Sequence, residues 1–419
     1  MAPADSRRVP RPHEASRPMT GAAPARLDPT TIIVVGCLIA LVTFGARAGF
    51  GLFLAPMSAA NGWGREVFSV AIGIQNILWG VGQPIAGMLA DRFGVAKVLI
   101  GGALVYCLGL VLMSLATTPF MLNLSAGVLI GIGGAGASFG LVLAAVGRMM
   151  PDERRSWALG IVMASASMGQ FMLAPLAQAS ILAFGWPTAL QLLGVVVLAV
   201  VPLSFPFAGA PPAAAAAGQT IGQAIREAAG HRSYWLLVAG FFVCGYHIAF
   251  IQTHLPAYIA DAGVPAWVGG WAIALVGLFN VMGAYSSGVL GGKHSKKYIL
   301  CLIYLGRALV ITAYVAFPPT TVSTLLFSAA MGLLWLSTVA PTAGLVAVMF
   351  GPRYMATLYG IVFLSHQVGA LLGVWMGGWF FDTTQSYAPV WWISVGLGLF
   401  AAIVHWPIAE RPVQRLATA

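Results

Sequence analysis

Apolar residues fill this chain in long runs that short polar stretches separate. Most runs reach about twenty residues or more, the length that a helix needs to cross the hydrocarbon core of a bilayer. Backbone inside a bilayer must satisfy its own hydrogen bonds, and a barrel would show alternating segments of about ten residues instead. The pattern therefore predicts an all-α membrane protein. Its twelve predicted spans cover residues 31–56, 67–90, 97–117, 119–147, 157–182, 187–207, 233–260, 266–291, 297–317, 321–349, 355–381 and 388–408.

The composition agrees with this pattern. Hydrophobic residues make up 59% of the 419 residues and charged residues 8%, whereas soluble domains average about 25% charged residues. A soluble protein is thereby excluded. The cysteines lie inside apolar runs without metal-ligand spacing, so we expect packing roles and neither a disulfide nor a metal site. They are Cys37, Cys107, Cys244 and Cys301.

Basic residues predict the orientation. The net charge is +10, and all but three of the 21 Lys and Arg residues fall in the tails or in alternate loops. Positive charge is retained on the cytoplasmic side of inner-membrane proteins. We therefore expect a multi-pass protein of the plasma (inner) membrane, with both termini in the cytoplasm. The three exceptions are Arg65 in an outer loop and Arg47 and Arg307 inside spans.

The spans divide six and six around an Ala/Pro-rich stretch. Weak internal symmetry supports two halves, because "GMLADRFG" (87–94) and "GVLGGKHSKK" (288–297) occupy matching places after spans two and eight. The predicted organisation is two pseudo-symmetric six-helix bundles with polar tails and a linker. The predicted boundaries are a disordered cytoplasmic tail at 1–30, the first bundle at 31–207, the linker at 208–231, the second bundle at 232–410 and a second tail at 411–419.

These features resemble the major facilitator superfamily, whose loop between spans two and three carries a G-x-L-a-D-r-x-G motif. The residues that match it are Gly87, Leu89, Asp91, Arg92 and Gly94. Within the superfamily, "RRSWALGIVMASASMG" (154–169) is similar to the fifth-span motif of monocarboxylate transporters. The span-eleven run "LYGIVFLSH" resembles the oxalate/formate exchangers, with His366 where those carry a lysine. The resemblance implies a transporter that works by alternating access, with an inner gate. The gate residues that it implies are Gly87, Asp91, Arg92, Arg154 and Arg155.

The chain also departs from these relatives. The aspartate-glycine-tryptophan motif that opens span one in animal monocarboxylate transporters is absent. Aligning "LFNVMGAYSSG" (278–288) to their span-eight motif puts Ala284 at the substrate-binding arginine and Asn280 at an acid that some of them carry. If this chain binds carboxylates, the cation must come from elsewhere.

Arg47 and Arg307 are the candidate cations. A charged residue inside a membrane is costly and marks a functional site by default. Arg47 lies about 13 Å from the outer end of span one, too deep for easy snorkelling. No Asp or Glu occurs within a predicted span. Neither arginine therefore has a carboxylate partner inside the membrane, unless Asp261 or Asp382 at outer span ends folds inward. A guanidinium without a counter-ion suits a carboxylate that arrives as substrate. The alternative for each arginine is structural, satisfying backbone carbonyls where a helix is broken or bridging helices.

Other polar residues lie on helical stripes and extend the candidate set. The predicted substrate-binding residues are Arg47, Arg307, His366, Asn76, Gln170 and Asn280. Histidine titrates near neutral pH, so the candidates for proton coupling are His247, His254 and His366. Each of these polar residues has a structural alternative as an interhelical hydrogen-bonding partner.

The sequence thus predicts a secondary active transporter of small organic anions, most of all monocarboxylates, by proton symport or anion exchange. A monomer is expected, without a cofactor and without nucleic acid as partner. An enzyme is not expected, because the chain has no nucleophile elbow, metal-spaced cluster or nucleotide loop. Two alternatives remain open, an exporter of neutral or drug-like solutes and a non-transporting receptor on the same scaffold.

Overall fold

The computed structural model describes residues 28–209, 221–351 and 354–413, and these are helical with no strand among them. Most of the predicted tails and the middle of the predicted linker lie outside the described residues. Ten helical stretches are long and apolar enough to cross a membrane. One of them contains predicted spans five and six, and α3 supplies predicted span two, so all twelve predicted spans are helical.

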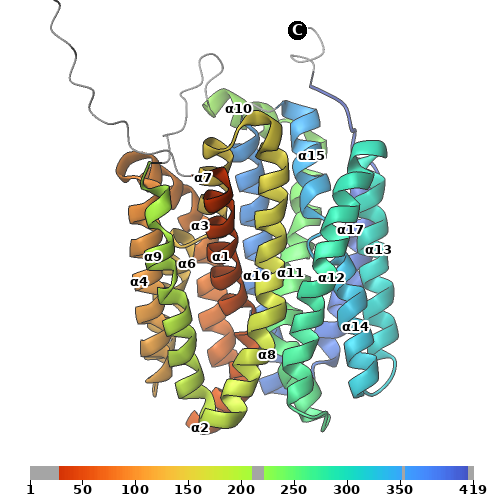
Figure 1. Ribbon diagram of the computed structural model, residues 1–419. Helices are drawn as coiled ribbons and strands as arrows, with labels where there is room; N and C mark the ends of the chain where they lie inside the picture. The colour runs from red at the N-terminus through yellow and green to blue at the C-terminus, as the bar shows by residue number, and fades with distance from the viewer. Residues whose placement is uncertain (1–27, 210–220, 352–353, 414–419) are drawn as a thin grey trace, which may run out of the picture.

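The first half runs from α1 to η2 (Figure 1). Its helices are α1 (Pro29–Ala48), α2 (Gly51–Asn61), α3 (Arg65–Phe93), α4 (Val95–Ser114), α5 (Pro119–Leu122), the π-helix η1 (Asn123–Leu129), α6 (Ile130–Gly136), α7 (Phe139–Met149), α8 (Asp152–Leu198), α9 (Val200–Leu203) and the 3-10 helix η2 (Phe205–Gly209).

The second half follows a short helix at the end of the linker, α10 (Ile221–Ala229). Its helices are α11 (Arg232–Asp261), α12 (Trp267–Lys293), α13 (Lys296–Val315), α14 (Thr321–Leu334), α15 (Val339–Phe350), α16 (Met355–Thr384) and α17 (Ala388–His405). The start of α1 and the end of the described chain lie at the same end of the bundle, where α10 also lies (Figure 1). We call this the α10 end and the opposite one the outer end.

Several predicted spans are broken. Span one divides into α1 and α2 at Gly49 and Phe50, and span ten divides into α14 and α15 between Leu334 and Val339. The long helix α8 turns back at Gly185, whose φ of 80° lies in the left-handed region that favours glycine. A break frees backbone carbonyls and N–H groups that must find other partners inside a membrane.

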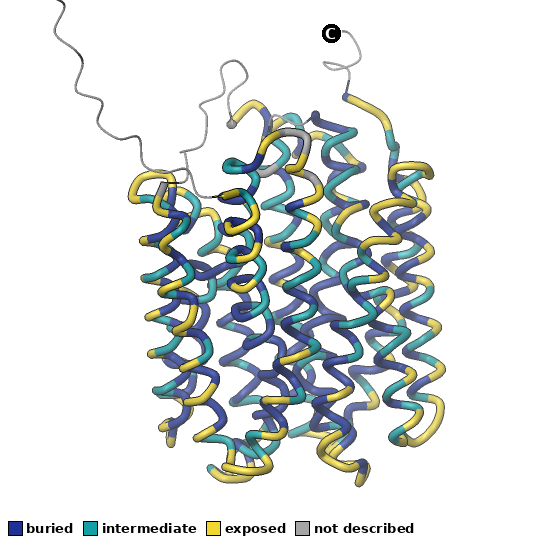
Figure 2. The backbone as a smooth tube through the Cα atoms, in the orientation of Figure 1, coloured by how far each residue is buried: buried dark blue, intermediate teal, exposed yellow. Residues whose placement is uncertain are grey.

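Each half has its own apolar core, and the halves meet along a seam. One cluster of buried residues centres on the first half and another on the second. The buried backbone runs through the middle of the bundle and exposed residues lie on its outside (Figure 2). The seam is formed mainly by α3 against α16, α8 against α12 and α2 against α11. Side chains on these helices are therefore the ones that a relative motion of the halves would separate.

Glycines along α3 show where the seam is closed. Gly73, Gly80 and Gly87 recur every seven residues and so share one face of the helix. A Cβ at Gly73 would overlap a side-chain atom of Leu371 in α16, and one at Gly80 would lie 2.6 Å from Gln367. A Cβ at Gly87 would meet nothing within 4 Å. The two halves are therefore packed closely at the outer end and diverge toward the α10 end.

Candidate functional site

Arg47 lies in the last turn of α1, beside the break that separates α1 from α2. Its Nη2 donates a hydrogen bond to the side-chain oxygen of Asn76 in α3. Its guanidinium carbon sits 4.3 Å from the ring centroid of Trp79, one turn further along α3. Among the described residues, no acid pairs with Arg47 and its Nε has no hydrogen-bond partner. The structure thus brings the predicted pair Arg47 and Asn76 together and leaves donors of the guanidinium unused.

Asn76 is held so that it can orient the arginine. Its Nδ2 donates to the carbonyl of Ile72 at 2.8 Å, one turn back on α3. This bond fixes the amide with its oxygen toward Arg47, because the amide nitrogen cannot accept. Asn76 is buried, so the Arg47 guanidinium has a preset direction before any ligand arrives.

A series of aromatic contacts connects Arg47 across the seam to α16. The Trp79 ring packs edge-on against Phe363 with centroids 5.5 Å apart, and Phe363 stacks on His366 at 5.5 Å. His366 contacts the side-chain oxygen of Gln367 through Nδ1 at 3.1 Å. The predicted residues Arg47, Asn76 and His366 therefore belong to one cluster at the seam, which we call the Arg47 cluster together with Trp79 and Phe363.

Arg307 has a different environment. Its Nε and Nη2 donate to the carbonyl of Leu334 at 3.1 and 2.8 Å, and Nη2 also bonds the carbonyl of Trp335. These carbonyls are the ones that the break between α14 and α15 leaves without helical partners. Arg307 has no exposed surface. These contacts fit the structural alternative, in which the guanidinium satisfies a broken helix. Its Nη1, however, has no hydrogen-bond partner among the described residues, so the contact with substrate stays a prediction.

Asn280 and Gln170 tie α12 to α8 across the seam. Asn280 donates to the hydroxyl of Ser167 at 2.8 Å and accepts from the backbone N–H of Leu336 at 2.9 Å. Gln170 donates to the carbonyl of Ile273 at 3.0 Å. Both side chains are about 1% exposed. They join helices in this conformation, which matches their structural alternative and places neither in the Arg47 cluster.

The three candidate histidines are separated. His247 is fully buried in the second half, where Nε2 bonds the carbonyl of Ser394 at 2.8 Å. His254 lies at the outer seam, 3.0 Å from the hydroxyl of Tyr387. His366 is the one that the structure places in the Arg47 cluster. The three histidines predicted from the sequence therefore lie in three different environments and do not form one proton-transfer chain.

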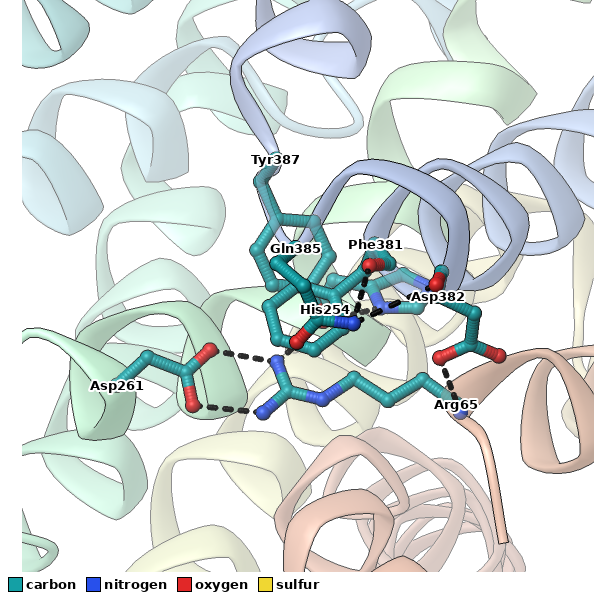
Figure 3. A network of polar contacts seen from close by, with 7 residues as sticks. All are labelled: Arg65, His254, Asp261, Phe381, Asp382, Gln385 and Tyr387. Atoms are coloured by element: carbon teal, nitrogen blue, oxygen red, sulfur yellow. Dashed lines mark hydrogen bonds and ion pairs between the residues drawn. The ribbon is translucent and has the colours of Figure 1, made fainter.

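A polar network that the sequence did not predict closes the outer end (Figure 3). Arg65, at the start of α3, forms a bidentate ion pair with Asp261 of α11, with both N···O distances at 2.6 Å. Its guanidinium also covers the ring of Phe381, 3.6 Å from the centroid. The pair joins the two halves, and Asp261 does fold toward the seam, but its partner is Arg65 and neither intramembrane arginine.

Asp382 contributes a second contact to this outer network. Its two carboxylate oxygens accept the backbone N–H groups of Arg65 and Glu66, each at 2.8 Å. These are the first two N–H groups of α3, which have no partner inside their own helix. The residue before them, Gly64, has no side chain to cap the helix. A carboxylate of the second half therefore caps a helix of the first.

Tyr387 extends the network to His254. Its hydroxyl accepts from Nη1 of Arg65 at 2.8 Å and donates to Nδ1 of His254. Burial raises the pKa of Tyr387 although Arg65 opposes the shift, so the phenol stays protonated and able to donate. Nε2 of His254 then donates to the carbonyl of Val374 at 2.9 Å. The network thus reaches from the outer surface into the α11–α16 contact.

The sequence held a signal for this network. Arg65 is the one basic residue in the predicted outer loops, and the acids Asp261 and Asp382 end spans on the same side. Opposite charges at span ends on one side of the membrane are potential partners across the seam. Their pairing was not predictable without knowing which spans lie side by side.

The predicted gate residues lie at the α10 end. Asp91 pairs with Arg148 of α7 at 3.7 Å, which is a contact within the first half. Arg92 is exposed and lies over the ring of Phe93. Nε of Arg155 donates to the carbonyl of Gly147 at 2.7 Å. Arg154 is exposed beside Trp157, on the surface of α8 away from α12. With Gly87 also uncontacted, these positions fit a gate that is open at this end.

Comparison with known proteins gives a consistent result. The family profile of the Major Facilitator Superfamily matches residues 36–374. The uncharacterized MFS-type transporter YcxA of Bacillus subtilis (strain 168) is 28% identical over 87% of this chain and 91% of its own. Monocarboxylate transporter 13 of Bos taurus is 25% identical, covering 89% of each chain.

Solved structures agree on the fold. A point mutant of the nucleoside transporter NupG superimposes with a TM-score of 0.73 at 13% identity, over 90% of this chain and 99% of its own. A D-xylose-proton symporter gives a TM-score of 0.71 at 15% identity, over 92% and 99%. At such identities the likeness concerns the fold and leaves the cargo open.

Proposed function

Because the chain belongs to the Major Facilitator Superfamily, a family of membrane transporters, we propose that it is a secondary active transporter of small monocarboxylates. The proposed mechanism is alternating access, in which the two halves rock about a central site. The Arg47 cluster is that site. The relatives named as monocarboxylate transporters support this choice of cargo.

The observation that carries the proposal is the state of the Arg47 guanidinium. It is oriented by Asn76 and Trp79, no described acid neutralises it, and part of its donor capacity is unused. A carboxylate accepts from such a fork in bidentate geometry and supplies the missing charge. A neutral solute would leave the charge uncompensated, and a cation would be repelled by it.

The Arg47 cluster contains one guanidinium, which favours a cargo with one carboxylate group. Arg307 lies outside this cluster; its Nε and Nη2 serve the carbonyls of Leu334 and Trp335, while its Nη1 has no hydrogen-bond partner among the described residues. A dicarboxylate would have to leave its second charge unpaired in a low-dielectric environment, which is costly. The rings of Trp79 and Phe363 suit an apolar remainder of the substrate.

The remaining parts of the mechanism follow the geometry of the seam. The outer network is closed, and the α10 end is where the α3 glycine stripe loses contact with α16. With the basic loops in the cytoplasm, as the distribution of Lys and Arg favours, this conformation faces inward in the inner membrane. His366, in contact with the aromatic chain, is the proposed residue for proton symport, with exchange of anions as the other coupling.

The first test measures binding. Purified protein is screened by thermal shift with carboxylates of graded length, their uncharged amides and organic cations. We expect stabilisation by some monocarboxylates and none by the matching amides. Arg47→Gln abolishes this response, and Arg47→Lys retains a weaker one because it keeps the charge and loses the fork. Equal stabilisation by amides, or a full response of Arg47→Gln, would show that the site recognises neutral solutes.

The second test measures transport. Ligands found by thermal shift are offered to proteoliposomes as radiolabelled substrates, with and without an inward proton gradient and with or without internal unlabelled anion. Uptake driven by the proton gradient indicates symport, and uptake driven by internal anion indicates exchange. Binding without any uptake under all conditions would identify a receptor instead of a transporter.

A further inference from the structure

A surface groove runs between α1 and the start of α8 at the α10 end of the first half. Its volume is about 380 Å³. Its walls are mainly apolar and include Val34 and Leu38 of α1 and Ile161 of α8, with Thr30 at the upper end. Val34 and Leu38 are 50% and 41% exposed. The apolar walls of the groove are therefore accessible from outside the helices.

The groove faces lipid and not the seam. On α8, Ser167 points at α12, where Asn280 bonds it. Ile161 is six residues earlier, which places it about 120° around the helix from that face. Met172 and Leu176 continue the Ile161 side into the closed outer half, and they are 46% and 57% exposed. Because the seam is shut at that level, the exposed side of α8 is its lipid side.

The length of the groove fits one acyl chain. Thr30 and Leu38 are eight residues apart, so the groove descends about 12 Å along α1. One leaflet of a bilayer contributes about 15 Å of hydrocarbon. The groove therefore begins at one interface and ends near the middle of the membrane, as a channel for one lipid tail would.

A charged residue at the mouth of the groove indicates which type of lipid headgroup would bind there. Arg154 is the one charged side chain among the described residues that line it, and no described residue pairs with its guanidinium. Trp157 stands beside it, 60% exposed, in the position of a residue at the membrane interface. An exposed guanidinium at the interface attracts the phosphate groups of anionic lipids.

We propose that this groove is a binding site for one anionic phospholipid, with an acyl chain along Val34 and Leu38 and its phosphodiester at Arg154. The sequence grouped Arg154 with the gate between the halves, but its place on the lipid side of α8 suits a headgroup better. The site lies entirely within the first half and does not depend on which cargo the transporter carries.

Native mass spectrometry of the purified, delipidated full chain tests the proposal. Phosphatidylglycerol, phosphatidylethanolamine and phosphatidylcholine with the same acyl chains are titrated in turn. We expect one phosphatidylglycerol to bind about fivefold more tightly than either of the others, the effect of one basic residue near a membrane surface. Arg154→Gln removes this preference. Arg92→Gln, which removes an exposed arginine from the same end of the same half, keeps it.

A second variant tests the contribution of the apolar groove independently of the charge of Arg154. Val34→Trp fills the groove with a bulky side chain at an exposed position and leaves Arg154 in place. We expect it to lose the tightly bound lipid while the protein elutes as the native protein does. The proposal is overturned if Arg92→Gln and Arg154→Gln weaken binding equally, if the wild type shows no preference among headgroups, or if Val34→Trp retains the lipid.

Discussion

Replacing Asp382 by alanine should open the outer end of the transporter. In the closed conformation its carboxylate accepts the first two N–H groups of α3 at 2.8 Å each. Loss of a helix cap costs about 0.5–2 kcal/mol, and loss of a negative charge at a helix N-terminus costs about 0.3–1 kcal/mol. Both terms exist when the halves are together and vanish when they part.

The variant therefore destabilises the closed state relative to the outer-open state by about 1–2 kcal/mol. That difference changes the ratio of the two states by a factor of about 5–30. Asp382→Asn should have a smaller effect, because its amide oxygen still accepts one N–H bond but carries no charge. The population of the outer-open state should therefore be largest in Asp382→Ala, intermediate in Asp382→Asn and smallest in the wild type.

Distances between spin labels measure this ratio directly. Labels at Ala60 and Ala262 report on the outer end, because both residues are exposed and lie in opposite halves. They are placed in a background without native cysteines, and the population at the longer distance is compared between variants. Thr383→Ala is the matched control, since the Thr383 hydroxyl bonds carbonyls of its own helix. An unchanged distance distribution in Asp382→Ala, or an equal change in Thr383→Ala, would refute the capping argument.

Three other substitutions test separate contacts. Asp261→Asn removes the ion pair with Arg65. Because the Asp261 side chain is 38% exposed and solvent weakens the pair, we expect a smaller destabilisation of the closed state, about 0.2–1 kcal/mol, that shrinks further in high salt when the spin-label experiment is repeated. Arg307→Gln leaves carbonyls at the helix break without a donor and should lower the thermal unfolding midpoint by about 3–4 °C, since disrupting a buried charged contact costs about 3 kcal/mol. A midpoint equal to that of the wild type would contradict the structural role. Hydrogen bonds from Ser295 and Lys296 outweigh partial burial and lower the pKa of Glu410. Its contribution to stability is therefore complete at neutral pH and is lost as the pH falls through the lowered pKa, so Glu410→Gln should reduce the difference in melting temperature between pH 7 and acid, and an undiminished difference would rule out this carboxylate.

The positions of the spans were predictable because each depends on a local property. Apolar length alone defined all twelve, and the charge of Arg47 in an apolar run was enough to single it out. Its pairing with Asn76 was within reach as a hypothesis, since both were candidates for one site. What local sequence did not show was how the break between α14 and α15 is satisfied. Pro341 lies just beyond the break and disfavours a continuous helix there, but nothing in the local sequence showed that Arg307 would satisfy the carbonyls of Leu334 and Trp335.

The outer network was beyond prediction for a different reason. Arg65 and Asp382 are more than three hundred residues apart, and their contact exists because α3 and α16 are neighbours in space. The charges were visible in the sequence, but the pairing follows from tertiary arrangement. The same applies to Trp79 and Phe363, whose contact connects the arginine of one half to the histidine of the other.

The glycine stripe of α3 has a consequence for leakage. At Gly73 and Gly80 the helix meets α16 almost at the level of its backbone. A gap of about 0.5–1 Å already forfeits about a quarter to a half of the dispersion attraction between such atoms. A slightly parted seam would thus lose part of its packing energy without yet admitting cargo. A partly open state loses packing energy without admitting cargo, so we expect the outer seam to switch between a closed and an open state. Such switching would limit the leakage of ions across the membrane through a partly open seam.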